Sequence, residues 1–280
     1  MLTRSAVRVL ADADLPDVWR VLDREPVAGA WVASRIALAG LAEWRLGAQV
    51  WGHGTGAALR SLCYSGANLV PVAATSEALA AFAQRARAQG RVCSSVVGPA
   101  EAVLPLWSLL EPAWGPARDI RARQPLMVTS SPPPVRPSPE VRQAIAADLG
   151  ALVPACVAMY TEEIGVSPIG RDGGAFYRSR VADSVRAGRT YVHTEGDRVV
   201  FKAELAAVTA AACQIQGVWV APDRRGQGLG AAGVAAVVDD ALRRVAPLVS
   251  LYVNDFNTTA VRVYERCGFR QVGTFASVLF

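Results

Sequence analysis

The stretch VWVAPDRRGQGLG, residues 218–230, places two arginines directly before three glycines at alternate positions. An apolar run typical of a buried strand precedes the glycines, and residues 229–244 carry apolar side chains at helical spacing. The glycines therefore fall where a strand passes into the N-terminus of a helix. Unpaired backbone N–H groups and the positive end of the helix dipole meet at such a point, and glycine lets a phosphate approach it closely.

Three interpretations of this glycine loop compete. A Walker A loop requires Gly-Lys-Ser/Thr after its glycines, and this segment has Gly-Leu-Gly, so that motif is excluded. A dinucleotide fingerprint of the form G-x-G-x-x-A is present at 226–231, but the short remainder of the sequence holds too few strands for such a sheet. The third interpretation is a glycine-rich turn with no ligand.

The composition is that of a globular chain. Of its 280 residues 52% are hydrophobic, yet the apolar stretches are shorter than the roughly 20 residues that a membrane-spanning helix needs. The net charge is +5, carried by arginines that alternate with acids, and Lys202 is the one lysine. No basic block indicates a nucleic-acid arm. We expect a cytoplasmic protein that binds neither membrane nor nucleic acid.

Cysteine and histidine usage argues against a metal site. The five cysteines are dispersed, no Cys-x-x-Cys pair occurs, and there are only two histidines. This pattern predicts reduced thiols in the core and no metal ligand set.

A proline-rich segment divides the sequence. The residues TSSPPPVRPSP (129–139) cannot continue a helix or an inner strand, so we interpret 131–138 as a stiff linker. The domains on either side, 1–130 and 139–280, are each long enough to hold a core.

The two domains share an order of elements. In the second domain we expect strand, helix, strand, helix and strand at 217–220, 229–244, 248–254, 258–266 and 270–280. In the first domain we expect the same succession at 68–73, 76–88, 91–97, 100–110 and 122–128. Where the second domain has the glycine loop, the first has only ATSEALA. The sequence predicts a tandem repeat whose first copy lacks the loop, although α/β chains also alternate in this way by chance.

A second motif follows one helix and one strand after the glycine loop. The stretch SLYVNDFNTTAVRVYERCGF (250–269) has an asparagine at a strand end and then a helix with a tyrosine before Gly-Phe. Together with the R-x-x-G-x-G element at 225–230, it resembles the acetyl-CoA-binding core of the GCN5-related N-acetyltransferases (GNAT). The resemblance covers about 139–280, and the first half matches only in element order, as in tandem acetyltransferases with one degenerate copy. It implies an α/β (α+β) fold of tandem acyl-CoA N-acyltransferase-like domains, each a mixed, mostly antiparallel sheet flanked by helices.

The resemblance also implies acetyl-CoA as the acyl donor substrate. The strand before the loop would bind the pantetheine arm through its backbone and polarise the thioester carbonyl, and the loop would take the diphosphate. Two asparagines would add contacts, although the second can also be the N-cap of the following helix. The implied residues are Val218, Trp219, Val220, Arg225, Gly226, Gln227, Gly228, Leu229, Gly230, Ala231, Asn254 and Asn257.

Tyr264 is the residue expected to act on the leaving group. A phenol beside the sulfur can protonate the departing CoA thiolate as a general acid. A tyrosine on an amphipathic helix can equally be a core residue whose hydroxyl bonds to backbone.

The general base is open between two places. Many family members have a glutamate on the strand that leads to the cofactor site, but the matching position here is Gln214, which cannot accept a proton. Glu204 in FKAELAA is the preferred substitute, with a structural pair to Lys202 as the alternative. Glu162 and Glu163 are the other option, either as part of the acceptor wall or as an exposed helix end.

The sequence thus predicts an acetyl-CoA-dependent N-acetyltransferase that transfers an acetyl group to an amine by direct attack in a ternary complex. Its first domain would shape the acceptor site or form a homodimer. The alternative is a non-catalytic acyl-CoA-binding or regulatory module, which the glutamine at position 214 and the degenerate first copy both allow. The identity of the amine stays open.

Overall fold

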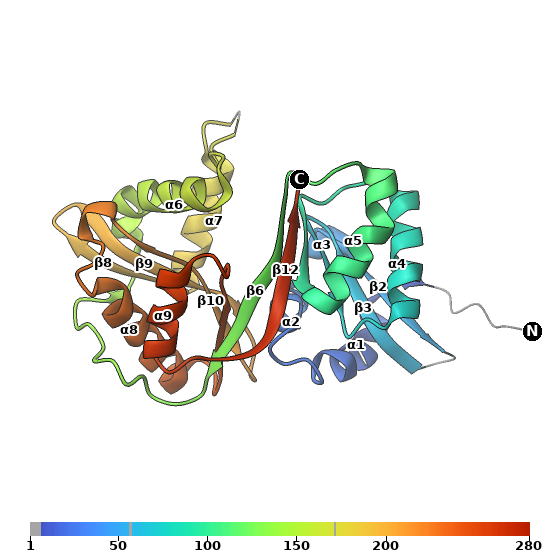
Figure 1. Ribbon diagram of the computed structural model, residues 1–280, viewed down its shortest axis with the longest axis horizontal. Coiled ribbons are helices and arrows are strands. Elements are labelled where there is room, and N and C mark those ends of the chain that lie inside the picture. The colour runs from blue at the N-terminus through green and yellow to red at the C-terminus, as the bar shows by residue number, and fades with distance from the viewer. Residues whose placement is uncertain (1–6, 56–57, 171) are drawn as a thin grey trace, which may run out of the picture. The chain divides into compact units, whose positions relative to one another are not determined.

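The computed structural model describes residues 7–55, 58–170 and 172–280. The chain packs as two compact units (Figure 1). The first unit consists of residues up to Met127 together with 252–257 and 271–280, and the second consists of 128–251 and 258–270.

The first unit contains a mixed sheet with strand order β1-β2-β3-β4-β5-β12-β6. Strand β3 is antiparallel to both β2 and β4, β12 is antiparallel to β5, and β4 runs parallel to β5. Its elements are β1 (Arg8–Val9), α1 (Leu15–Leu22), α2 (Ala30–Ala39), α3 (Glu43–Leu46), β2 (Gln49–Thr55), β3 (Ala58–Ser65), β4 (Asn68–Val72), α4 (Ser76–Gln89), β5 (Ser95–Pro99), α5 (Ala100–Trp114), β6 (Asp119–Thr129) and β12 (Arg270–Leu279).

Helices cover both faces of this sheet (Figure 1). Successive strand residues point to opposite faces, so Trp51 and Cys63 join the core under α4 and α5. Their neighbours Val50 and Leu62 join the core under α1 and α2. Both clusters consist of apolar side chains that are almost fully buried. A helix with one apolar face must bury that face against another element, and here the sheet provides that surface.

The last strand of the chain lies in the first unit. Strand β12 pairs with β5 from Phe275↔Pro99 to Leu279↔Ser95, and Ala276 belongs to the core under α4 and α5. The sequence grouped this strand with residues 139–280, so the linear division at 131–138 stays a prediction. The strand expected at 91–97 begins only at Ser95, because the residues before it form a loop.

The second unit repeats the arrangement with strand order β7-β8-β9-β10-β11. The first four strands are antiparallel, and β10 runs parallel to β11. Its elements are β7 (Arg142–Gln143), α6 (Leu149–Ile164), α7 (Ala175–Arg186), β8 (Thr190–Glu195), β9 (Arg198–Val208), β10 (Cys213–Val220), α8 (Leu229–Arg244), β11 (Val249–Tyr252) and α9 (Thr258–Arg266).

Helices also cover both faces of the second sheet (Figure 1). Leu152 and Cys156 of α6 pack with Val181 of α7 and Val200 of β9. On the opposite face α8 comes very close to the sheet, since a Cβ on Gly233 would lie 2.5 Å from the ring of Phe201. Glycine at this position therefore permits the helix to settle on β9.

An arginine–aspartate contact of the same kind precedes helix α1 in the first unit and helix α6 in the second. Arg8 donates to both oxygens of the Asp14 carboxylate, at 2.9 and 2.6 Å, just before α1. Arg142 donates in the same way to Asp148, at 2.7 and 2.8 Å, just before α6. The pattern V-R-x-x-x-x-A-D-L occurs at 7–15 and again at 141–149. This repeat in sequence and in structure is a stronger sign of duplication than element order, and the sequence analysis overlooked it.

Each unit is a mixed, mostly antiparallel sheet flanked by helices, so the predicted α/β (α+β) class is confirmed. All five cysteines are buried and unpaired. Within the described ranges, every helix is too short or too polar to span a bilayer.

Candidate active site

Strand β10 is irregular where the sequence placed the pantetheine-binding residues. It pairs with β9 at Gln216↔Glu204 and next at Trp219↔Lys202, so two residues of β10 face one residue of β9. The first of the two, Gly217, has φ +58°, a conformation that favours glycine. This β-bulge takes backbone groups out of the regular ladder and makes them available to another partner.

The other edge of β10 separates from its neighbour. The parallel pairing with β11 includes Cys213↔Val249 and Gln214↔Ser250, and the described residues show no further pair between these strands. Residues 218–220 therefore keep a sheet partner on the β9 side alone. An extended ligand can add to such an open strand edge through backbone hydrogen bonds.

The glycine loop is open to solvent. Gly226 and Gly228 have φ of +76° and +84°, and a Cβ built on either would meet no atom within 4 Å. Gly228 is the N-cap residue of α8, and no side chain bonds to this helix end. The backbone is accessible where a diphosphate would have to approach it.

The amides of this loop are unpaired. In the described parts of the chain, no backbone N–H from Gly226 to Ala231 donates a hydrogen bond. The first amide in this turn to do so is Ala232, which donates to the carbonyl of Gly228 at 3.1 Å. Unpaired donors at the positive end of a helix of this length form an anion-binding surface, so the residues present fit a CoA diphosphate.

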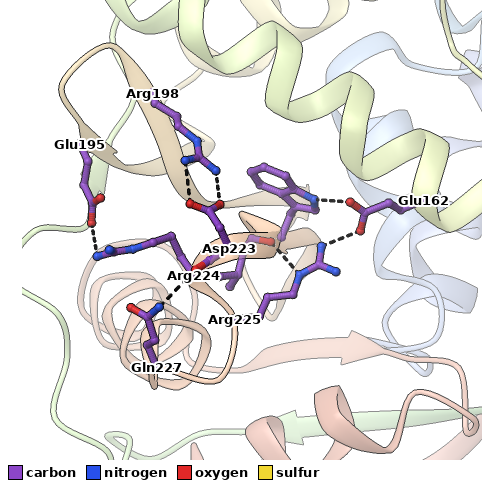
Figure 2. A network of polar contacts seen from close by, with 9 residues as sticks. Glu162, Glu195, Arg198, Asp223, Arg224, Arg225 and Gln227 are labelled. Atoms are coloured by element: carbon purple, nitrogen blue, oxygen red, sulfur yellow. Dashed lines mark hydrogen bonds and ion pairs between the residues drawn. The ribbon is translucent and has the colours of Figure 1, made fainter.

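The side chains of the arginines near the loop form ion pairs with acidic residues and do not add free positive charge beside the loop amides. Figure 2 shows Arg198 bonded to Asp223, Arg224 to Glu195 and Arg225 to Glu162. The last two contacts are 2.6 and 2.7 Å long. The positive charge of this segment is thus neutralised locally, and the attraction for an anion comes from backbone amides.

Tyr264 lies on α9 and is 8% exposed. Its ring packs edge-on against Phe269 with 6.0 Å between centroids. Burial raises the pKa of the phenol, and the nearby carboxylate of Glu163 raises it further. The phenol is therefore protonated at neutral pH, as a general acid must be.

Glu204 and Lys202 share a face of β9, and both reach the bulge. From the point that a Cβ on Gly217 would occupy, Lys202 Nζ is 3.0 Å away and Glu204 Oε1 is 3.2 Å away. Lys202 is 1% exposed, so the chain's one lysine is buried beside this carboxylate. Burial raises the pKa of the Cys156 thiol of α6, and the charge of Lys202 opposes that effect. The structure thus places the side chains of both Glu204 and Lys202 at the bulge.

Three other polar residues from the sequence analysis are engaged elsewhere. Gln214 is buried, and its Oε1 accepts from Gln216 Nε2 at 3.0 Å. Asn254 and Asn257 belong to the segment that packs with the first unit, where Asn254 Oδ1 accepts from Gln124 Nε2 at 2.8 Å. A role for the two asparagines in binding acetyl-CoA stays a prediction.

Sequence reasoning missed two features of the site, the ion-pair partner of Arg225 and the β-bulge at Gly217. It considered Glu162 as an alternative base in the acceptor wall or as part of an exposed helix end, whereas its carboxylate bonds Arg225. It treated Gly217 as an ordinary strand residue. A glycine inside a strand pattern is a known sign of a bulge, so the second signal was present in the sequence.

Residues 162–269 match the acetyltransferase (GNAT) family model. Residues 48–152 match a domain of unknown function (DUF4081), a segment that runs through the proline-rich stretch into α6.

Solved structures share the fold over nearly the full length. A GCN5-related N-acetyltransferase from Sphaerobacter thermophilus aligns with 100% of this chain and 96% of its own, at 17% identity and a TM-score of 0.63. A tandem GNAT protein from the clavulanic acid biosynthesis pathway aligns over 98% of both chains, at 16% identity and a TM-score of 0.54. A GNAT-family acetyltransferase from Colwellia psychrerythraea covers 98% of this chain and 99% of its own, at 12% identity and a TM-score of 0.58. No curated protein matches the sequence.

The match of residues 162–269 to the GNAT family model supports an acyl-CoA-dependent acyltransferase activity in general. Among the residues that the structure describes, no three His, Cys, Asp or Glu side chains gather as a metal-binding group.

Proposed function

We propose that the chain transfers the acetyl group of acetyl-CoA to an amine by direct attack in a ternary complex. The observation that carries the proposal is the row of unpaired amides from Gly226 to Ala231 at the open N-terminus of α8. These donors suit the diphosphate, and the free edge of 218–220 suits the pantetheine arm. In this proposal residues 226–231 bind through their backbone.

The chemistry proposed for the bulge is aminolysis of a thioester. The amine nitrogen attacks the carbonyl carbon, a C–N bond forms and the C–S bond breaks. A free N–H of Val218, Trp219 or Val220 would stabilise the developing oxyanion. Tyr264, which is protonated at neutral pH, gives its proton to the departing thiolate.

Glu204 is the proposed acceptor of the amine proton. A protonated amine cannot attack, so a base must take its proton directly or through water. The carboxylate of Glu204 lies beside the bulge, whereas that of Glu163 lies near the tyrosine. We therefore assign the base to Glu204 rather than to Glu163. A homodimeric state and a cytoplasmic location stay predictions.

The test has two stages on one sample. Acetyl-CoA binding is measured by calorimetry, and thiol release is then followed with a panel of amines. We expect binding with a 1:1 ratio and thiol release with at least one amine. Binding without turnover on any amine would favour the non-catalytic module, and no binding at all would overturn the assignment.

A pair of glycine substitutions makes the test specific. Gly228 and Gly47 both have a left-handed backbone, with φ of +84° and +68°, and open space at the Cβ position. Changing either to Ala should cost about 1–2 kcal/mol of stability because of backbone strain. Only Gly228→Ala should also weaken acetyl-CoA binding, by about tenfold or more, since its Cβ stands where the diphosphate meets the backbone. Equal affinities of the two variants for acetyl-CoA would contradict the proposed diphosphate site.

A further inference from the structure

The carboxylate of Glu162 uses both of its oxygens to hold the entry to the glycine loop. Oε2 accepts from Arg225 Nη2 at 2.7 Å, and Oε1 accepts from the indole Nε1 of Trp219 at 3.3 Å (Figure 2). Arg225 in turn donates its Nε to the carbonyl of Val220 at 3.0 Å. One side chain of α6 therefore ties together the end of β10 and the first residue of the loop.

These contacts restrain a part of β10 that the sheet holds weakly. Residues 218–220 follow a bulge and have a sheet partner on the β9 side alone. Trp219 is 9% exposed, so its indole forms part of the wall between α6 and the sheet. The bridge through Glu162 fixes the direction in which the strand leaves the sheet and hence where the loop amides point.

The other two ion pairs of the loop connect it to strands β8 and β9 and not to α6. Arg224 bonds to Glu195 at the end of β8, and Asp223 bonds to Arg198 at the start of β9. Both contacts link the loop to the hairpin whose second strand already pairs with β10. Among the three pairs that Figure 2 draws, only the one through Glu162 reaches a helix, and that helix also carries Glu163.

We propose that Glu162 is a positioning residue that couples acyl-CoA binding at the glycine loop to the position of helix α6. The inference rests on the proposed function, because it assumes that the loop binds acetyl-CoA. The guanidinium of Arg225 acts here as a bridge between Val220 and Glu162. Because the coupling is reciprocal, a ligand at the loop steadies α6, and an ordered α6 favours the ligand.

A rival arrangement predicts the opposite sign. If Arg225 were a phosphate ligand held back by Glu162, removing the carboxylate would release the guanidinium and strengthen acetyl-CoA binding. If Glu162 positions the loop, removing it weakens binding. The sign of one affinity change therefore separates the two arrangements.

The experiment measures the acetyl-CoA dissociation constant of the full-length chain by calorimetry. Glu162→Ala is expected to raise it about 5-fold or more, the size of a typical coupling between sites. Arg225→Lys should act similarly, since an ammonium keeps the charge but cannot reach Val220 and Glu162 together. The double variant Glu162→Ala/Arg225→Lys should be no weaker than either single one by more than about 2-fold, because the same bridge is broken.

Glu195→Ala is the matched control. It removes a carboxylate from the neighbouring arginine of the same loop at a similar distance, 2.6 Å against 2.7 Å. Its effect on the dissociation constant should stay within about 2-fold, because the hairpin that carries Glu195 is already joined to β10 by strand pairing. The melting temperature of ligand-free Glu195→Ala should match that of the unchanged chain, since an exposed ion pair contributes little to stability.

Hydrogen exchange distinguishes coupling through Glu162 from a merely structural role of this residue. Adding acetyl-CoA should slow exchange in α6 of the unchanged chain and leave α6 of Glu162→Ala unaffected. Tighter or unchanged binding by Glu162→Ala would overturn the inference while leaving the proposed function standing. Failure of the unchanged chain to bind acetyl-CoA would overturn both.

Discussion

Helix α4 of the first unit and helix α8 of the second occupy the same place in the order of elements, but their N-termini differ. At α4, Thr75 Oγ1 accepts from the N–H of Ala78 at 3.2 Å, so the chain caps its own helix. At α8, Gly228 stands at the cap position, and the amides around it are left open. One helix end is satisfied internally, and the other is available to an anion.

The preceding strands show what the two copies share and what they do not. Strand β4 has two parallel residue pairs with β5, as β10 has with β11. In both units, therefore, the two parallel strands pair over a short length and then separate. Strand β4 pairs with β3 without a register shift, whereas β10 has its bulge beside β9. The framework is duplicated, and the features suited to acetyl-CoA are found in the second copy.

Removing the last strand is the largest perturbation that this comparison suggests. Val278 of β12 is 0% exposed, and Phe280 packs on Trp107 with 5.5 Å between ring centroids. Each buried apolar side chain of this size contributes about 1.5–3 kcal/mol, against a total stability of roughly 5–15 kcal/mol. A chain ended at Arg270 should therefore lose the fold of its first unit, seen as rapid hydrogen exchange in β5 and α5.

The same experiment tests the linear division of the chain. Val272→Ser changes a β12 residue that is 45% exposed, and it should leave exchange unaltered. If truncation instead unprotects residues 139–251 and spares β5 and α5, the last strand belongs energetically with the second copy.

The catalytic difference between the copies centres on one phenol. Helix α5 has no tyrosine, whereas Tyr264 of α9 is the proposed acid. Tyr264→Phe should lower kcat about 100-fold or more and leave the acetyl-CoA dissociation constant within about 2-fold, because only the proton donor is lost. Steady-state thiol release and calorimetry measure the two quantities.

Tyr191→Phe is the matching control for that variant. The Tyr191 hydroxyl donates to Asp240 at 2.7 Å, and burial raises the pKa of this phenol as well. Its loss should reduce stability by about 1 kcal/mol with no change in kcat. Undiminished turnover by Tyr264→Phe would remove the tyrosine from the mechanism.

Local sequence features predicted much of the second unit. The glycine loop and the helix after it follow from short-range patterns, so their positions could be read from residues 217–244. The destination of the last strand could not, because pairing between residues as distant as Ser95 and Leu279 leaves no local mark. Nor could the partner of Arg225, since an arginine beside glycines looks the same whether its side chain meets phosphate or a glutamate of another helix.

The smallest expected effect tests whether the two copies of the arginine–aspartate contact contribute equally to the free energy of unfolding. Arg8 and Arg142 hydrogen-bond to Asp14 and Asp148, and these bonds lower the pKa of both carboxyl groups. A lowered pKa in the folded chain stabilises it above the unfolded value of roughly 3.9, and this contribution disappears as the pH falls through the folded value. Asp14→Asn and Asp148→Asn should each cost up to about 1 kcal/mol at neutral pH, as the loss of a partly exposed ion pair does.

Thermal unfolding between neutral pH and strongly acid solution measures these differences. The gap between each variant and the unchanged chain should be constant above about pH 5 and should shrink towards zero as the pH falls. Asp197→Asn, in the turn between β8 and β9, serves as the control and should show no such gap. Unequal gaps at the two sites would mean that the copies share a geometry whose energetic weight has diverged, as their glycine and threonine helix ends already have.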